Sequence, residues 1–275
     1  MRNKEDRSFI ILKLGGSLMT DKSKPFSLRK KVLRRVISEI IQTKKNVIII
    51  HGGGSFAHPI AKKYNINSGR DRKIQNQIFG LTKTHNVMTE LNKYVVDEFM
   101  KREIPALSIQ SSTIFLMDLT KGLKINSEII KLNLELGIIP ILYGDVIFHS
   151  DGNFSIISGD TIILKLCECL QSYNISKVIF LMETNGLYIN DEKSEIKLAL
   201  NIKYGDIESI PLANLGGKID ITGGIKIKLQ NIKEILKLGI PVQLVNGLKE
   251  NFVKEALFDK KIESTCFFPP HEKDS

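Results

Sequence analysis

The sequence predicts an α/β protein, a three-layer αβα sandwich in which helices cover both faces of a mostly parallel central sheet. Apolar, β-branched runs of strand length alternate with longer segments whose apolar residues recur at helical spacing. Strands that alternate with helices are typical of a parallel sheet buried between helical layers. The chain has 275 residues, of which 42% are hydrophobic and 25% are charged, so it can bury an extensive core. We expect one domain over residues 1–275, with an N-lobe of about 1–173 and a C-lobe of about 174–275.

The first half of the chain carries strong strand and helix signals. Phe9 to Leu14 is an apolar strand, interrupted only by Lys13, and Val47 to Ile50 is an uninterrupted β-branched strand. Pro59 suits the first position of a helix, which would place His58 at or beside its N-cap. Further helices are expected over 28–44, 75–102 and 125–136, and further strands over 104–109 and 138–142.

The second half repeats the same alternation. Ser150 to Asn153 has the turn residues of a β-hairpin within 148–156. A strand over 154–157 then leads into Ser158-Gly159-Asp160-Thr161, where Asp160 either caps the following helix or holds a lysine. Strands are expected over 178–182 and 242–245, and helices over 225–238 and 250–257.

Five loops that contain glycine follow strand ends or open helices. Glycine allows a ligand to approach the backbone closely, and helix N-termini attract anions, so such loops at the carboxyl edge of a parallel sheet predict a phosphate site. Lysines near some of these loops favour the same interpretation. The loops are Gly15-Gly16-Ser17 with Lys22 nearby, Gly52-Gly53-Gly54, Ser158-Gly159-Asp160, Glu183-Thr184-Asn185-Gly186, and Thr222-Gly223-Gly224 with Lys226 and Lys228.

Lys13 is the strongest single candidate for a functional side chain. A lysine inside an apolar strand costs several kcal/mol unless it is paired. Asp145, by contrast, is expected to cap a turn after an apolar strand. The remaining histidines do not cluster and are expected to be structural or solvated, and the three cysteines to be buried hydrophobes without a metal site: His51, His85, His149 and His271; Cys167, Cys169 and Cys266.

Composition excludes several other classes of protein. The net charge of +10 is expected to reflect evenly solvated lysines, and the absence of tryptophan disfavours a base-stacking surface for nucleic acid. A nucleic-acid binding protein would explain the charge but not the glycine loops. The sequence shows neither a signal peptide nor a run of about 20 apolar residues, so we expect no membrane partner and a cytoplasmic location.

Four motifs together resemble the amino acid kinase superfamily: Lys-x-Gly-Gly-Ser at 13–17, His-Gly-Gly-Gly at 51–54, Ser-Gly-Asp at 158–160, and Thr-Gly-Gly followed by lysine at 222–228. Within it, the segments 20–22, 54–59 and 144–146 are similar to the isopentenyl phosphate kinase family. The chain departs from the family pattern at Ala57, which replaces a glycine, at Thr161, which replaces an aspartate, and in the loop 183–186.

The resemblance implies transfer of a phosphoryl group from ATP to isopentenyl phosphate with Mg²⁺, by a protein that forms a homodimer. It implies that the N-lobe binds the acceptor and the C-lobe binds the nucleotide. Lys13 would lie between donor and acceptor, with Asp160 orienting it. The acceptor would contact Gly53, Gly54, His58, Gly159 and Phe79, and ATP would contact Gly15, Gly16, Ser17, Lys22, Thr184, Gly186, Gly223 and Lys226, which is preferred to Lys228.

Other functions remain open at this point. A kinase of the same fold could act on a phosphonate such as fosfomycin, an amino acid carboxylate, carbamate or UMP. A nucleotide sensor without catalytic activity is a further alternative, which the presence of both Lys13 and Asp160 disfavours.

Overall fold

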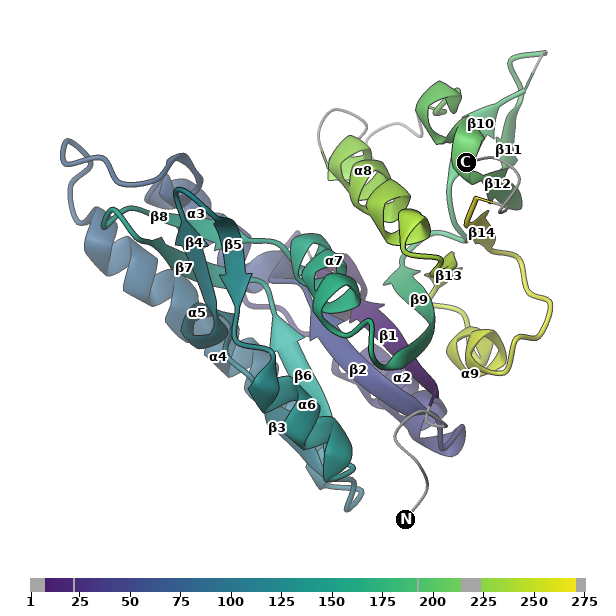
Figure 1. The fold of residues 1–275 in the computed structure, drawn as a ribbon, viewed down its shortest axis with the longest axis horizontal. Helices are drawn as coiled ribbons and strands as arrows, with labels where there is room; N and C mark the ends of the chain where they lie inside the picture. Colours follow the sequence, from purple (N-terminus) through teal and green to yellow (C-terminus); the bar gives the residue numbers. More distant parts are fainter. Residues whose placement is uncertain (1–7, 22, 192, 214–223, 271–275) are drawn as a thin grey trace.

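An eight-stranded sheet forms the centre of the molecule (Figure 1). The computed structural model describes residues 8–21, 23–191, 193–213 and 224–270. Neighbouring strands of this sheet pair in parallel, except β13 with β14, which confirms the predicted mostly parallel α/β architecture. In spatial order the strands are β12 (Asn201–Lys203), β14 (Thr265–Phe268), β13 (Val242–Asn246), β9 (Asn174–Met182), β1 (Ser8–Leu14), β2 (Asn46–His51), β6 (Ile139–Tyr143) and β3 (Ala106–Ser108).

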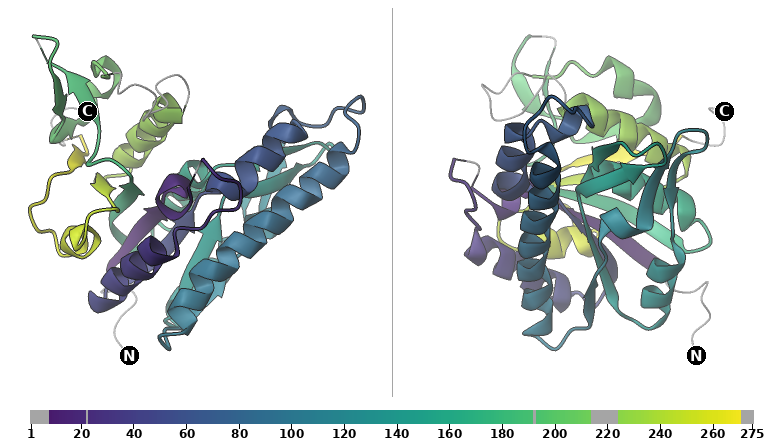
Figure 2. Two further views of the ribbon diagram at one scale, coloured as in Figure 1. Left: turned by 180° about the vertical axis from the view of Figure 1, so that it is seen from behind. Right: turned by 90° about the vertical axis from the view of Figure 1, so that its left-hand side faces the viewer.

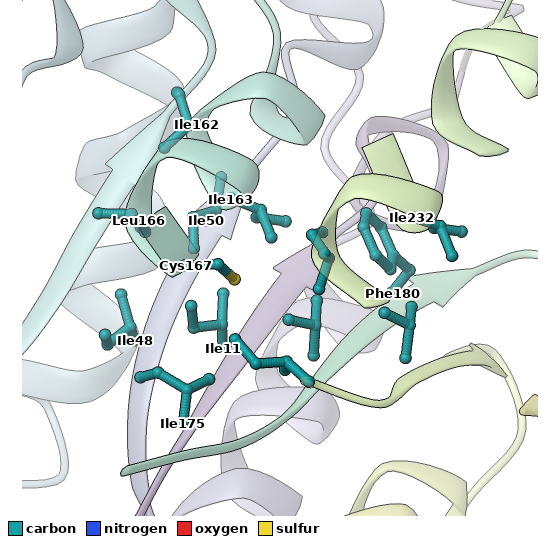
Figure 3. Close-up of a cluster of buried hydrophobic side chains, with 14 of the residues drawn as sticks. Ile11, Ile48, Ile50, Ile162, Ile163, Leu166, Cys167, Ile175, Phe180 and Ile232 are labelled. Carbon is teal, nitrogen blue, oxygen red and sulfur yellow. The ribbon is translucent and has the colours of Figure 1, made fainter. Parts of the chain in front are cut away.

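Helices cover both faces of this sheet (Figures 1 and 2). Because side chains alternate along a strand, Phe9 and Ile11 of β1 belong to one core cluster and Ile10 and Leu12 to another. The first cluster includes side chains of α6 (Glu128–Glu135), α7 (Gly159–Cys169) and α8 (Gly224–Lys237), and Figure 3 shows the part between β1, β2, α7 and α8. The second includes side chains of α2 (Lys30–Gln42), α3 (Gly54–Lys63), α4 (Gln77–Met100) and α9 (Phe252–Leu257).

A second, four-stranded sheet packs beside α4, with the strand order β5, β4, β7, β8. The hairpin expected around residues 150–153 is confirmed as β7 (Asp145–His149) and β8 (Phe154–Ile157). The sequence reading missed β4 (Phe115–Asp118) and β5 (Gly122–Ile125), and also the hairpin of β10 (Tyr188–Asn190) and β11 (Ile196–Leu198). Single-turn segments complete the described chain: α1 (Gly16–Met19), α5 (Ser111–Ile114), η2 (Ile66–Ser68) and the longer η3 (Tyr204–Ser209).

Three predicted element boundaries are wrong for identifiable reasons. The strand expected over 178–182 begins earlier, at Asn174, because Asn174 already pairs with Ser8 of β1. The helix expected over 125–136 begins at Glu128 because Ile125 still pairs with Phe115 in β5. The strand expected over 104–109 is only β3, which pairs with β6 at the edge of the sheet. The division into lobes near residue 174 stays a prediction, since β9 begins there and lies between β1 and β13 in the continuous sheet.

Candidate active site

The loops after the central strands lie together at one edge of the sheet, because parallel strands end on the same side. Each loop begins with an amide that extends the strand pairing: Gly15 N–H donates to Leu181 O at 3.1 Å, and Gly52 N–H donates to Leu14 O at 3.2 Å. The amide of Gly144 donates to His51 O in the same way, at 3.1 Å. The backbone of glycines that follow several strands therefore forms this edge of the sheet.

Two of the glycine loops pack directly against each other. A Cβ atom on Gly16 would lie 2.5 Å from the amide nitrogen of Gly54, and a Cβ on Gly54 would lie 2.0 Å from Thr20 Oγ1. Gly54 also has a positive φ of 48°, which other residues rarely adopt. The hydroxyl of Thr20 joins the two loops, since it donates to Gly16 O at 2.7 Å and accepts from Ser55 N–H at 2.9 Å.

A buried cluster of three charged side chains lies beside these loops. Lys13 follows Ile11 by two residues, so its side chain faces α7 and α8, where its ammonium group contacts Asp160 Oδ1. Lys228 of α8 donates to the other carboxylate oxygen, Oδ2, at 2.9 Å. The three side chains are only 12–14% exposed. The ring of Phe180 lies beneath both lysines, with its centroid 4.4 Å from Lys228 Nζ and 5.7 Å from Lys13 Nζ.

The cluster carries one more positive than negative charge, and this sets its protonation. Burial alone would raise the pKa of Asp160, but the charges of Lys13 and Lys228 outweigh it and hold the pKa well below its usual value. Burial and the charge of Lys13 lower the pKa of Lys228 to about 8. Two cations around one ionised carboxylate suit a ligand with several negative charges.

Asp160 holds the lysines, and Ser158 caps the helix. Ser158 is the N-cap residue of α7, and its Oγ accepts from Thr161 N–H at 3.1 Å. Asp160 lies in the first turn, where its negative charge also favours the helix dipole. Gly159 lies between Ser158 and Asp160 in the chain and packs against the Lys13 side chain, because a Cβ on Gly159 would lie 3.1 Å from Lys13 Cε. Thr161 thus serves the cap in this chain.

His58 lies one turn inside α3, so its predicted place at the N-cap is wrong. The helix begins at Gly54, and Pro59 lies within it. A proline has no N–H to donate to the carbonyl four residues earlier, which here belongs to Ser55. That carbonyl accepts from the backbone N–H of Phe26 at 3.2 Å instead, so the helix continues through the proline. His58 is exposed on the outer part of α3.

Phe79 lies on α4 and is 60% exposed. Its ring meets the edge of the Tyr64 ring at a centroid distance of 6.4 Å, next to Lys83 Nζ at 6.0 Å. The side chain is not part of the core. Its predicted contact with an acceptor stays a prediction.

The predicted nucleotide residues divide into three groups. Gly15, Gly16 and Ser17 lie in the first glycine loop and at the start of α1, which follow the strand that carries Lys13. Thr184 donates from Oγ1 to Gly186 O at 3.1 Å, so its hydroxyl closes the turn after β9. The third group, Lys22 and Gly223, lies outside the described residues.

Lys226 is exposed on α8, and Lys228 is the lysine of that helix that reaches Asp160. From the sequence, Lys226 was preferred for contact with ATP, which stays a prediction, but the structure places Lys228 in the charged cluster. The physical reason is helix phase: Lys228 follows Ile225 by three residues and precedes Ile232 by four, so it lies on their buried side.

Comparison with known proteins agrees with this geometry. The model of the amino acid kinase family matches residues 8–246. The isopentenyl phosphate kinase of Methanothermobacter thermautotrophicus is 31% identical over 270 residues, which cover 95% of this chain and 100% of the relative. The isopentenyl phosphate kinase of Methanocaldococcus jannaschii is 31% identical over 265 residues, 93% of this chain and 96% of the relative.

The chain belongs to the amino acid kinase family, among the isopentenyl phosphate kinases. A crystal structure described as an isopentenyl phosphate kinase superposes with a TM-score of 0.78 at 28% identity, covering 94% of this chain and 99% of that one. The family predicted from the motifs is thereby confirmed. In this member the superfamily loops are joined by Thr20 and by the Lys13–Asp160–Lys228 cluster.

The described residues show neither a cluster of metal ligands nor a membrane-spanning helix. In the ranges that the structure describes, no group of three or more His, Cys, Asp or Glu side chains is placed to hold a metal ion. Among the same described residues, no helix combines the length and apolar character that crossing a bilayer requires.

Proposed function

We propose that this isopentenyl phosphate kinase family member transfers the γ-phosphoryl group of ATP to the phosphate of isopentenyl phosphate, giving isopentenyl diphosphate. The observation that carries the proposal is the relationship to named isopentenyl phosphate kinases over nearly the whole chain. The buried cationic cluster beside glycine loops supports the reaction class independently, because it suits polyphosphate binding.

The chemistry requires charge compensation and does not require a general base. A phosphate monoester has a second pKa of about 6, so its attacking oxygen is already ionised at neutral pH. Asp160 is unsuited to accept a proton, because both of its oxygens contact lysines and its pKa is lowered. The site therefore fits an acceptor that arrives as a dianion.

Lys13 and Lys228 neutralise the phosphate groups of the donor and the transferring group, while Asp160 fixes the position of both ammonium groups. Lys228 takes the role that the sequence reading assigned to Lys226. Lys13, Asp160 and Lys228 together carry a net positive charge in the free site. Negative charge that develops on the phosphoryl group in the transition state is therefore stabilised by this excess positive charge.

The acceptor phosphate binds to the amides around Gly53, Gly54 and Gly159, and to His58. The backbone N–H of Ser55 already donates a hydrogen bond to Thr20 Oγ1, so it is not available to the ligand. Phe79 contacts the alkyl part of the acceptor.

ATP binds along Gly15, Gly16, Ser17, Thr184 and Gly186, with Lys22 and Gly223 retained as further predicted contacts. The residues present fit a magnesium ion held by the nucleotide, since both oxygens of Asp160 are occupied by lysines. Mg²⁺ would supply a Lewis acid on the phosphate oxygens, with those oxygens and water as its ligands.

We also retain a cytoplasmic homodimer as part of the proposal, by resemblance to the family. Sedimentation of the purified protein at micromolar concentration would show a mass near 62 kDa, twice the 31.0 kDa of the chain. A single 31.0 kDa species would contradict the dimer.

The function is tested by a coupled assay of ADP release. The acceptors are isopentenyl phosphate, dimethylallyl phosphate, geranyl phosphate, fosfomycin, glutamate, aspartate, carbamate and UMP. We expect the highest kcat/KM with isopentenyl phosphate. Preference for fosfomycin, a carboxylate, carbamate or UMP would contradict the substrate, and ATP binding without turnover of any acceptor would indicate a sensor.

A further inference from the structure

His85 and Asp145 form an ion pair outside the charged cluster and outside every role assigned above. His85 Nδ1 donates to Asp145 at 2.8 Å from Oδ2 and 3.1 Å from Oδ1. The aspartate side chain is fully buried, while that of His85 is 30% exposed. Both sequence expectations, a turn cap for Asp145 and an unclustered histidine for His85, miss this pair.

The ion pair fixes the Nδ1 edge of the His85 ring and leaves the Nε2 atom available to a ligand. Asp145 also accepts from the backbone N–H of Val146 at 2.8 Å, which fixes the carboxylate on β7. Among the described residues, Nε2 of His85 has no hydrogen-bond partner. A histidine whose Nδ1 is bound by a carboxylate has its tautomer and orientation set, so Nε2 presents a donor in a defined direction.

The location of the pair is the boundary between the glycine loops and a small apolar cluster. On one side, Leu81 and Val146 pack in the cluster that also contains Ala61, Ile66 and Phe154. On the other side, Gly144 precedes Asp145, and a Cβ on Gly144 would lie 3.5 Å from the amide nitrogen of Gly159. An acceptor with a phosphate head and a short alkyl tail needs this sequence of polar and apolar surroundings.

His85 on α4 and His58 on the neighbouring helix α3 lie at about the same position along the two helix axes. A Cβ on Gly53, at the start of α3, would approach Met88 Sδ to 2.9 Å, and a Cβ on Gly80 of α4 would approach the Tyr64 ring to 2.1 Å. The two helices therefore run antiparallel in contact, with residues 53 and 88 level at one end and 64 and 80 at the other. Midway between these contacts lie His58 on α3 and His85 on α4.

We propose that His85, oriented by Asp145, is a second histidine of the acceptor site and donates from Nε2 to the phosphate of the acceptor. The inference rests on the proposed function and extends it by one binding residue and one positioning residue. The hydrogen bond to Asp145 raises the pKa of His85, which favours the cationic ring that a phosphate dianion binds best.

Two substitutions separate the two ring nitrogens. His85→Asn can keep a donor near the position of Nδ1 and so retain the bond to Asp145, but it has no group at the position of Nε2. His85→Gln can place a donor near the position of Nε2. Loss of a hydrogen bond to a charged group predicts that His85→Asn raises KM for isopentenyl phosphate about 10- to 100-fold. His85→Gln should recover part of that loss.

Only the acceptor should be affected. KM for ATP should stay within about twofold in both variants, and Asn86→Ala, an exposed neighbour on the same helix, serves as the matched control. Asp145→Asn should raise KM for isopentenyl phosphate more than it changes kcat, because a positioning residue acts through the orientation of the ring.

The decisive readout combines these kinetics with ¹⁵N NMR of histidine-labelled protein, in which His85→Asn assigns the His85 signals. Saturation with isopentenyl phosphate in the absence of ATP should shift His85 Nε2. An unshifted signal, or a His85→Asn variant with wild-type KM and only a lower melting temperature, would overturn the inference. If the wild-type protein does not phosphorylate isopentenyl phosphate, the proposed function fails first. If it does and His85→Asn is unaffected, only this inference fails.

Discussion

Replacement of Lys13 by methionine separates catalysis from stability. Methionine keeps most of the length and volume of the lysine stem and removes its charge. Of the three buried charges, Asp160 and Lys228 then remain as a neutral pair with their 2.9 Å hydrogen bond. A buried ion that loses its only partner costs about 3–5 kcal/mol, but here no ion is left without one. We therefore expect the free energy of unfolding to fall by well under 3 kcal/mol.

The expected loss is in the chemical step. Lys13 contacts the carboxylate of Asp160 and lies against Gly159, so in the proposed reaction its charge would act on the transferring phosphoryl group. Removing one preorganised donor to developing charge lowers kcat about 10²- to 10³-fold, equivalent to about 2.7–4 kcal/mol. The variant should also raise the pKa of Lys228, because the charge of Lys13 is one of the causes that lower it.

The assay is steady-state ADP release with isopentenyl phosphate, together with chemical unfolding of the same protein. Asp160→Ala is the contrasting variant, since it leaves two buried ammonium groups without their carboxylate and should cost about 3–5 kcal/mol of stability. Unchanged kcat with a raised KM for ATP would show that Lys13 only binds the ground state. Equal destabilisation by Lys13→Met and Asp160→Ala would refute the charge argument.

Three further predictions concern Lys228, His58 and Phe79. Because the pKa of Lys228 is lowered to about 8, kcat/KM for ATP should fall as pH rises through that value, and Lys228→Arg should lack this limb; a flat wild-type profile would contradict the assignment. His58→Ala should lower kcat/KM by about 2–4 kcal/mol and His58→Gln should recover part of it, whereas wild-type turnover by the alanine variant would show that the glycine amides suffice. Phe79→Ala should improve activity on geranyl phosphate relative to isopentenyl phosphate, and an unchanged ratio would place Phe79 outside the acceptor pocket.

The overall architecture was predictable because a strand that is buried on both faces has an uninterrupted run of apolar residues in the sequence. Val47 to Ile50 are all fully or almost fully buried, as expected for a parallel strand covered on both faces. The buried charge of Lys13 was equally visible, since no solvated face explains a lysine in such a strand. The second sheet was not predictable in the same way: β4 and β5 have only four residues each, and the alternation that β5 shows is too short to be told from a loop.

Contacts between distant segments were the least visible in the sequence. Asp145 and His85 are 60 positions apart and belong to different layers, so neither residue carries a local signal of the pair. Gly54 and Thr20 are similar, because each lies in a recognisable loop but their contact depends on how the loops pack. Local rules predicted which loops lie at this edge of the sheet, and tertiary packing decided which side chains meet there.

The choice between Lys226 and Lys228 shows where a local rule was sufficient but not applied. The motif over 222–228 admitted either lysine and Lys226 was preferred, yet the apolar residues of α8 define its buried side independently of that loop. Ile225 and Ile232 are buried, and Lys228 lies three residues after the first and four before the second. A lysine on that side must find a carboxylate, and Asp160 on the adjacent α7 provides it. The phase of the helix therefore decides which of the two lysines reaches Asp160.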